Sequence, residues 1–153
     1  MESASRSIAP VLAVVQNEPL LKKPVAVVID DDEATTLYLT EFLLEKGWAV
    51  FAFCSANEGI KHFENAFEGT DVAAQSVPCD ILFTDLRMPE LDGHLILKKV
   101  HELFPLLPVV LMTAYASVFG AVDAVHEGAF DYLPKPLSLV RISTLLSKVS
   151  HSS

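Results

Sequence analysis

Five short apolar runs, each followed by a segment with helical spacing, constrain what this 153-residue chain can fold into. The runs are nearly continuous and rich in β-branched residues, which is typical of strands buried on both faces of a parallel sheet. Because strand and helix alternate five times, the sequence predicts an α/β, doubly wound (βα)5 domain with helices on both faces of its sheet. The predicted strands are Val25–Ile29, Ala49–Phe53, Ile81–Thr84, Val109–Met112 and Phe130–Leu133.

The segments between these strands carry helix signals. Gly47 ends the first predicted helix, and the capping box Ser55-Ala56-Asn57-Glu58 opens the second. The five helices are predicted at about residues 34–46, 55–67, 93–104, 117–127 and from Ser138 onward. The expected core residues of the first helix are Leu37, Leu39, Phe42, Leu43 and Leu44.

We expect one domain, over residues 24–150, because the chain has about the length of one domain and contains no internal repeat. Residues 1–23 form an amino-terminal arm, and the sequence leaves open whether the arm is disordered or docks its Val11–Val15 run on the domain. Residues 151–153 form a tail. Residues 68–78 are predicted to be a long surface loop.

Composition and charge exclude several classes of function. Twenty acidic residues against 11 basic ones give a net charge of −9, which argues against a nucleic-acid-binding surface and suits a protein that holds a cation. No apolar run is long enough to span a membrane, and Ile8–Val15 is too short and too interrupted to be a secretory signal. Cys54 and Cys79 lack metal-ligand spacing, and we interpret them as buried thiols in a reducing compartment, the cytoplasm.

Chemically active side chains follow four of the predicted strands. Because the carboxyl ends of parallel strands meet at one edge of a sheet, these residues should gather there. They are Asp30 and Asp31 after the first strand, Asp85 after the third, Thr113 after the fourth and Lys135 after the fifth. Three clustered carboxylates repel one another unless a cation compensates, and Mg²⁺ accepts such oxygen ligands. Asp85 taken alone has a plainer explanation, as a cap for the next helix.

An Asp beside Mg²⁺, an amine and a hydroxyl is equipped to attack a phosphoryl group. The positive charges offset the charge on the phosphoryl oxygens while the carboxylate attacks in line with the leaving group. The sequence therefore predicts that Asp85 forms an aspartyl phosphate.

The motifs at the strand ends resemble the receiver domains of bacterial two-component response regulators. The matching stretches are Val28–Asp31, Asp85–Gly93, Met112–Ala114 and Lys135–Pro136, and Gly128–Pro136 is further similar to the nitrogen-regulatory (NtrC-type) branch. The resemblance implies a flavodoxin-like fold with strand order 2-1-3-4-5.

The same resemblance assigns roles residue by residue. Asp85 would accept the phosphoryl group of a phosphohistidine on a histidine kinase or phosphotransfer protein, and would catalyse its own phosphorylation and slow dephosphorylation rather than act as an enzyme. Thr113, the Ala114 amide and Lys135 would bind the phosphoryl oxygens. Thr113 and Tyr132 would form the switch. The Mg²⁺ ligands would be Asp30, Asp31, Asp85 and the backbone carbonyl of Arg87.

Two variable positions of the family, occupied here by Arg87 and Tyr115, tune the lifetime of the phosphate. A bulky Tyr115 would hinder water from reaching the phosphorus; a solvent-facing side chain without a role is the alternative. The resemblance also implies an output surface on the fourth helix, fifth strand and fifth helix. That surface would contact a downstream protein, a linked output domain or a second copy of the chain in a homodimer. Either a single-domain regulator or a piece of a longer regulator fits.

Two rival functions remain. A haloacid-dehalogenase-type phosphatase also uses an Asp nucleophile and Mg²⁺, and Asp30–Ala34 nearly matches its first motif, although Ala34 fails the final position. In that case Asp30 would carry the phosphate. A pseudo-receiver that binds partners without phosphorylation is the second rival, and it is disfavoured because every chemically required residue is present.

Overall fold

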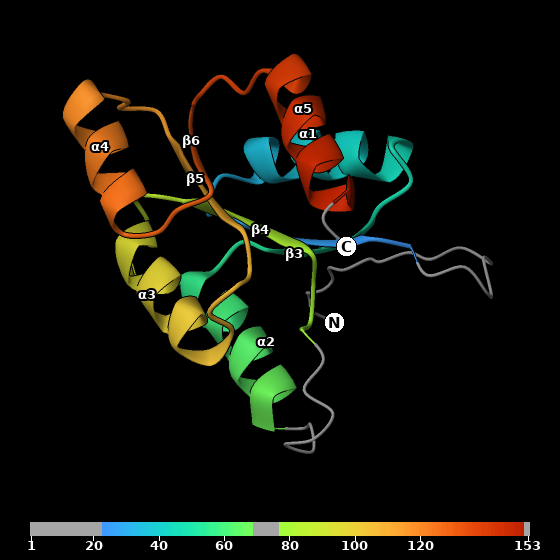
Figure 1. Ribbon diagram of the computed structural model, residues 1–153, viewed down its shortest axis with the longest axis horizontal. Coiled ribbons are helices and arrows are strands. Elements are labelled where there is room, and N and C mark those ends of the chain that lie inside the picture. Colours follow the sequence, from blue (N-terminus) through green and yellow to red (C-terminus); the bar gives the residue numbers. More distant parts are fainter. Residues whose placement is uncertain (1–22, 69–76, 152–153) are drawn as a thin grey trace.

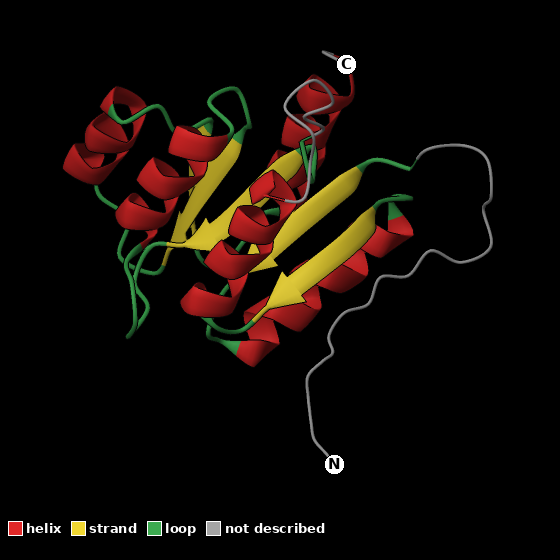
Figure 2. Cartoon of the chain, turned by 90° about the horizontal axis from the view of Figure 1, so that it is seen from below, coloured by secondary structure: helices red, strands yellow, loops and turns green. Residues whose placement is uncertain are grey.

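The computed structural model describes residues 23–68 and 77–151, and it contains a five-stranded parallel sheet. The strands are β2 (Val25–Ile29), β3 (Ala49–Phe53), β4 (Ile81–Asp85), β5 (Val109–Thr113) and β6 (Asp131–Pro134). Their order across the sheet is β3-β2-β4-β5-β6, and all neighbours pair in parallel (Figure 2). Counted along the chain, this is the predicted order 2-1-3-4-5.

Five helices cover both faces of the sheet (Figure 1). The helices α1 (Glu33–Glu45) and α5 (Leu139–His151) pack on one face, over a core that includes Leu39, Phe83 and Ile142. The helices α2 (Ala56–Glu68), α3 (Gly93–Leu103) and α4 (Val118–His126) contribute to the core on the other face. The predicted doubly wound architecture is confirmed.

The predicted core of α1 is partly wrong. Leu39 and Leu43 are fully buried, but Leu37 is 60% and Leu44 is 41% exposed. At about 100° per residue, these two leucines lie on the opposite side of the helix from the buried pair. The third buried position of α1 is Thr36, a polar residue that the hydrophobic pattern passed over.

Two further predictions are wrong in detail. Cys54 is exposed, because the strand ends at Phe53 and the chain leaves the sheet before the thiol. Phe130 lies just outside β6 and is 41% exposed. Cys79 is buried as predicted, and burial raises the pKa of its thiol.

The parallel register brings the carboxyl ends of the strands together. Asp85, the last residue of β4, pairs with Met112, and Thr113, the last residue of β5, pairs with Pro134. Over residues 23–68 and 77–151, the helices are too short or too polar to cross a membrane. The predicted arm lies outside the described residues except for Lys23, and so does most of the loop at 68–78.

Candidate phosphoacceptor site

Asp30 leaves the sheet directly after β2, and its side chain is completely buried. Its Oδ1 accepts a hydrogen bond from the backbone N–H of Asp32 (2.9 Å), and its carbonyl oxygen accepts one from the hydroxyl of Thr36 (3.0 Å). Thr36 therefore fixes the turn that carries Asp30. Thr36 shares the buried face of α1 with Leu39 and Leu43, but a hydrophobic pattern does not mark a polar residue there.

Lys135 reaches two carboxylates that come from different strands. Its Nζ lies 2.7 Å from Oδ2 of Asp30 and 3.2 Å from Oδ1 of Asp85. The backbone holds Lys135 in place, because its N–H donates to the Thr113 carbonyl at 2.8 Å. The structure thus brings together three of the residues that the sequence assigned to the site. The Lys135–Pro136 peptide bond is cis.

A third carboxylate completes an acidic cluster. Asp30, Asp31 and Asp85 each offer an oxygen, and these oxygens lie within 4.8 Å of one another. Oδ2 of Asp30 is buried, and the Lys135 ammonium pairs with it at 2.7 Å. Carboxylate oxygens gathered this closely are fitting ligands for a hard cation such as Mg²⁺. The three carboxylates therefore fit Mg²⁺.

Burial dominates the electrostatics of this cluster. It raises the pKa of Asp30 above its ordinary value, against the opposing effect of Lys135. It also raises the pKa of Asp85, to which the negative charge of Asp30 adds. Burial disfavours the Lys135 ammonium, but the two carboxylates outweigh that penalty and raise its pKa. The lysine therefore stays charged, while burial and mutual repulsion make the ionised form of the carboxylates unfavourable.

Thr113 and the residues after it lie on the other side of Asp85 from Asp30, because β4 lies between β2 and β5. Thr113 is 1% exposed, and its Oγ1 accepts a hydrogen bond from the N–H of Tyr115 at 3.0 Å. Ala114 is exposed beside it. The Arg87 guanidinium lies over the Tyr115 ring, 4.9 Å from its centroid. The two variable positions named above therefore touch each other, in a cation–π contact.

Tyr132 lies inward, at 8% exposure, and touches the start of α4. Its hydroxyl accepts a hydrogen bond from the backbone N–H of Ser117 (3.3 Å), and Ser117 caps α4 through the N–H of Gly120 (2.9 Å). A Cβ on Gly120 would lie 2.4 Å from the Tyr132 hydroxyl oxygen. Gly120, which sequence reasoning missed, therefore leaves room for the inward position of Tyr132.

Comparison with known proteins defines the class. Residues 26–147 match the family model of the response regulator receiver domain. The chain therefore belongs to the receiver domains of response regulators, which serve as phosphoacceptors in two-component signalling. The phosphatase and pseudo-receiver alternatives are not favoured.

Relatives and solved structures refine this assignment. The chain is 36% identical over 121 residues to the DNA-binding transcriptional regulator NtrC of Proteus hauseri, covering 79% of this chain and 23% of that protein. It is 37% identical over 121 residues to the transcriptional regulatory protein ZraR of Escherichia coli (strain K12), covering 79% and 25%. The chain thus spans about a quarter of the length of these curated relatives.

Among solved structures, a two-component response regulator from Clostridium difficile superimposes with a TM-score of 0.72 at 24% identity, covering 84% of this chain and 97% of that one. A receiver domain from Clostridium thermocellum gives a TM-score of 0.70 at 27% identity, covering 82% and 93%. Both confirm the receiver fold predicted from the strand-end motifs.

Proposed function

We propose that Asp85 is the residue of this receiver domain that accepts the phosphoryl group. The observation that carries the proposal is the placement of Asp85 Oδ1 3.2 Å from the Lys135 ammonium, within a cluster of three carboxylates at the carboxyl edge of the sheet. Asp85 ends β4, the middle strand of the sheet, and faces Asp30 and Asp31 that follow the neighbouring strand β2.

In the proposed reaction, an Asp85 oxygen attacks the phosphorus of a phosphohistidine in line with the P–N bond. The new O–P bond forms as the P–N bond breaks, and the imidazole leaves with the electron pair of that bond. Lys135, the Thr113 hydroxyl and the Ala114 N–H bind the phosphoryl oxygens and stabilise their charge. Later attack by water would return Asp85 and free phosphate.

A divalent cation fits the same site. Asp30, Asp31, Asp85 and the Arg87 carbonyl would hold Mg²⁺, which supplies positive charge against the three phosphoryl oxygens when bound. The Thr113 hydroxyl accepts the Tyr115 N–H and still has its own hydrogen to donate to a phosphoryl oxygen. A movement of Thr113 toward the phosphate would be the local event from which the switch starts.

The switch couples the site to α4. Phosphorylation adds about −1.5 to −2 charges at Asp85. Tyr132, which already lies inward at 8% exposure, would respond to a movement of Thr113. Because the Tyr132 hydroxyl meets the Ser117 N–H, a shift of Tyr132 alters the first turn of α4. The effect of phosphorylation is a population shift between two arrangements of α4. The size of this shift is limited by the difference between the contacts that the phosphate makes in the two arrangements.

The output surface comprises α4, β6 and α5. On α4, Ala124 is buried and Ala121 packs against the core, whereas Phe119 and Val125 are 84% and 70% exposed. Val140 on α5 is 79% exposed. We propose that these apolar side chains contact a partner: an output domain, a downstream protein or a second copy. The incoming phosphate would come from a cytoplasmic histidine kinase or phosphotransfer protein.

Locating the phosphate tests the proposal. After incubation with acetyl phosphate and Mg²⁺, mass spectrometry should place one phosphate on Asp85 of the wild type. Asp85→Asn should abolish phosphate uptake while leaving the fold intact. Stoichiometric uptake by Asp85→Asn at an unchanged rate would overturn the proposal. Phosphate on Asp30 would favour the phosphatase alternative, and failure to form any phosphate or beryllofluoride adduct would favour a pseudo-receiver.

A further inference from the structure

Glu90 has no role in the function proposed above, yet its carboxylate ties the loop after β4 to the start of α2. Its Oε1 accepts a hydrogen bond from the backbone N–H of Ala56 at 2.9 Å, and Ser55 Oγ donates to Oε1 (3.2 Å) and approaches Oε2 (3.4 Å). The first N–H groups of a helix lack partners within the helix and favour a negative charge. The contact therefore joins two segments 34 residues apart in the sequence.

The tethered loop, residues 86–92, is also fixed at both ends. The Leu86 N–H donates to the Met112 carbonyl and the Gly93 N–H donates to the Leu86 carbonyl, both at 2.8 Å. The loop returns so close to the strand that a Cβ on Gly93 would lie 2.6 Å from the Asp85 carbonyl oxygen. Met88, at 8% exposure, reaches into the core. The backbone of Arg87 lies between these fixed points.

We propose that Glu90 is a positioning residue for the cation site. By holding the outer part of the loop against α2, it keeps the Arg87 carbonyl in place for Mg²⁺. This rests on the proposed function, in which that carbonyl is a ligand. Because coupling between two binding events is reciprocal, Mg²⁺ binding must also strengthen the hold of Glu90 on the first turn of α2.

The affinity of the domain for Mg²⁺ is the direct readout. Calorimetric titration with MgCl₂ should show Glu90→Ala binding about tenfold more weakly than wild type, as for other residues that orient metal ligands. Glu90→Gln keeps a side-chain oxygen that accepts the Ala56 N–H, and should therefore recover most of the affinity. Wild-type affinity in Glu90→Ala would overturn the proposal.

Glu58→Ala is the matched control. Glu58 is exposed in the first turn of the same helix, and the hydrogen bond to Ser55 Oγ comes from its backbone N–H, so the substitution removes a helix-start charge without freeing the loop. Urea unfolding in EDTA should show similar losses of stability for Glu58→Ala and Glu90→Ala, and only the latter should weaken Mg²⁺ binding. An equal loss of affinity in both variants would reduce Glu90 to a general stabiliser of α2 and would overturn its positioning role.

Hydrogen exchange at the Ala56 amide tests the reciprocal effect. Mg²⁺ should slow this exchange in wild type and leave it unchanged in Glu90→Ala. If Mg²⁺ binds to wild type and the Ala56 amide exchanges at the same rate, the proposed coupling is wrong while the cation site stands. Asp30→Asn identifies a failure of the site itself, because its loss of Mg²⁺ binding is expected whatever Glu90 does.

Discussion

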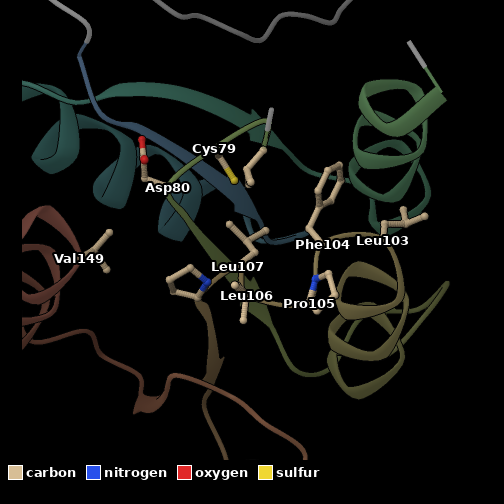
Figure 3. Close-up of a pocket in the computed structure, with 10 residues that line it drawn as sticks. Cys79, Asp80, Leu103, Phe104, Pro105, Leu106, Leu107 and Val149 are labelled. Atoms are coloured by element: carbon tan, nitrogen blue, oxygen red, sulfur yellow. The ribbon is translucent and has the colours of Figure 1, made fainter. Parts of the chain in front are cut away.

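The carboxyl and amino edges of the sheet, where the strands end and begin, differ in the kind of residue they gather. At the carboxyl edge, Asp30, Asp85 and Lys135 bring charge into a largely buried site. At the amino edge, the segments that lead into β4 and β5 line a largely apolar surface pocket of about 500 Å³ (Figure 3). Its lining consists of Val77, Cys79, Asp80, Leu103, Phe104, Pro105, Leu106, Leu107, Pro108 and Val149.

The difference separates function from stability. Burying carboxylates costs free energy that the ion pairs with Lys135 only partly return, whereas apolar burial at the other edge stabilises the fold. Strained electrostatics are common where a site must bind a charged group. We therefore expect substitutions at the amino edge to lower stability with little effect on phosphorylation. Substitutions of charged residues at the carboxyl edge should impair phosphorylation without lowering stability.

The largest stability effect is expected from Phe104→Ala. Phe104 is 4% exposed and its ring centroid lies 5.9 Å from that of Phe67 and 6.3 Å from that of Phe63. Losing the ring should cost about 3–5 kcal/mol in the free energy of unfolding by urea. The rate of phosphorylation per folded molecule by acetyl phosphate should stay within about twofold of wild type. A much slower rate would show that the two edges are coupled.

Asp85→Asn should change stability in the opposite direction. In EDTA at neutral pH, removing one buried negative charge should raise the free energy of unfolding by about 0.5–2 kcal/mol, as is common when a strained site is neutralised. Lys135 keeps its partner Asp30 at 2.7 Å. The control at the amino edge is Asp80→Asn, since Asp80 Oδ2 accepts the Val25 N–H at 2.8 Å and should not gain stability. A loss of stability in Asp85→Asn would contradict the comparison.

The pH dependence of stability tests the same contrast through the protonation of the buried carboxylates. Since the pKa of Asp30 and Asp85 is raised in the folded state, the folded protein binds protons more tightly than the unfolded chain. Their contribution to stability therefore rises as pH falls from neutral toward the ordinary Asp range near about 4. Denaturation in EDTA at several pH values should show a smaller rise for Asp85→Asn than for wild type. Identical slopes would mean that the Asp85 pKa is not raised.

Sequence reasoning reached the fold and the strand-end residues because both depend on local patterns. Alternating strands and helices fix the layers, and parallel strands must bring Asp30, Asp85, Thr113 and Lys135 to one edge. The pattern did not identify Thr36, because a buried Thr is recognised by the hydrogen bond it makes to the Asp30 carbonyl. Leu37 and Leu44 were wrongly predicted to lie in the core, because α1 carries apolar residues on a wider part of its surface than the part that packs against the sheet.

The contacts that join distant segments were beyond prediction. Glu90 meets Ala56, and Gly120 leaves room for Tyr132, only after the chain is folded. An acidic residue in a loop and a glycine in a helix carry no sequence signal for such partners. At Gly120 the helix accepts a residue that costs about 1 kcal/mol relative to Ala. The close approach of the Tyr132 hydroxyl supplies the reason.

The smallest expected effect concerns the lifetime of the phosphate, at the exposed rim of the carboxyl edge. Tyr115 is 70% exposed, so its removal should hardly change stability. Its ring is nevertheless held under the Arg87 guanidinium, 4.9 Å from the centroid, and we expect the ring to hinder water from reaching the phosphorus. Tyr115→Gly should therefore shorten the dephosphorylation half-life several-fold, with an unfolding free energy within about 0.5 kcal/mol of wild type.

Tyr115→Phe separates the two explanations for such an effect. It keeps the ring and its contact with Arg87 but removes the hydroxyl, so a steric shield predicts a half-life close to wild type. The half-life of Arg87→Ala should lie between those of Tyr115→Phe and Tyr115→Gly, because this substitution frees the Tyr115 ring without removing it. The half-life is measured by following loss of the phosphorylated form after the phosphodonor is removed. An unchanged half-life in Tyr115→Gly would make Tyr115 a solvent-facing side chain without a role, and the chemistry of the carboxyl edge would then depend on its buried charges alone.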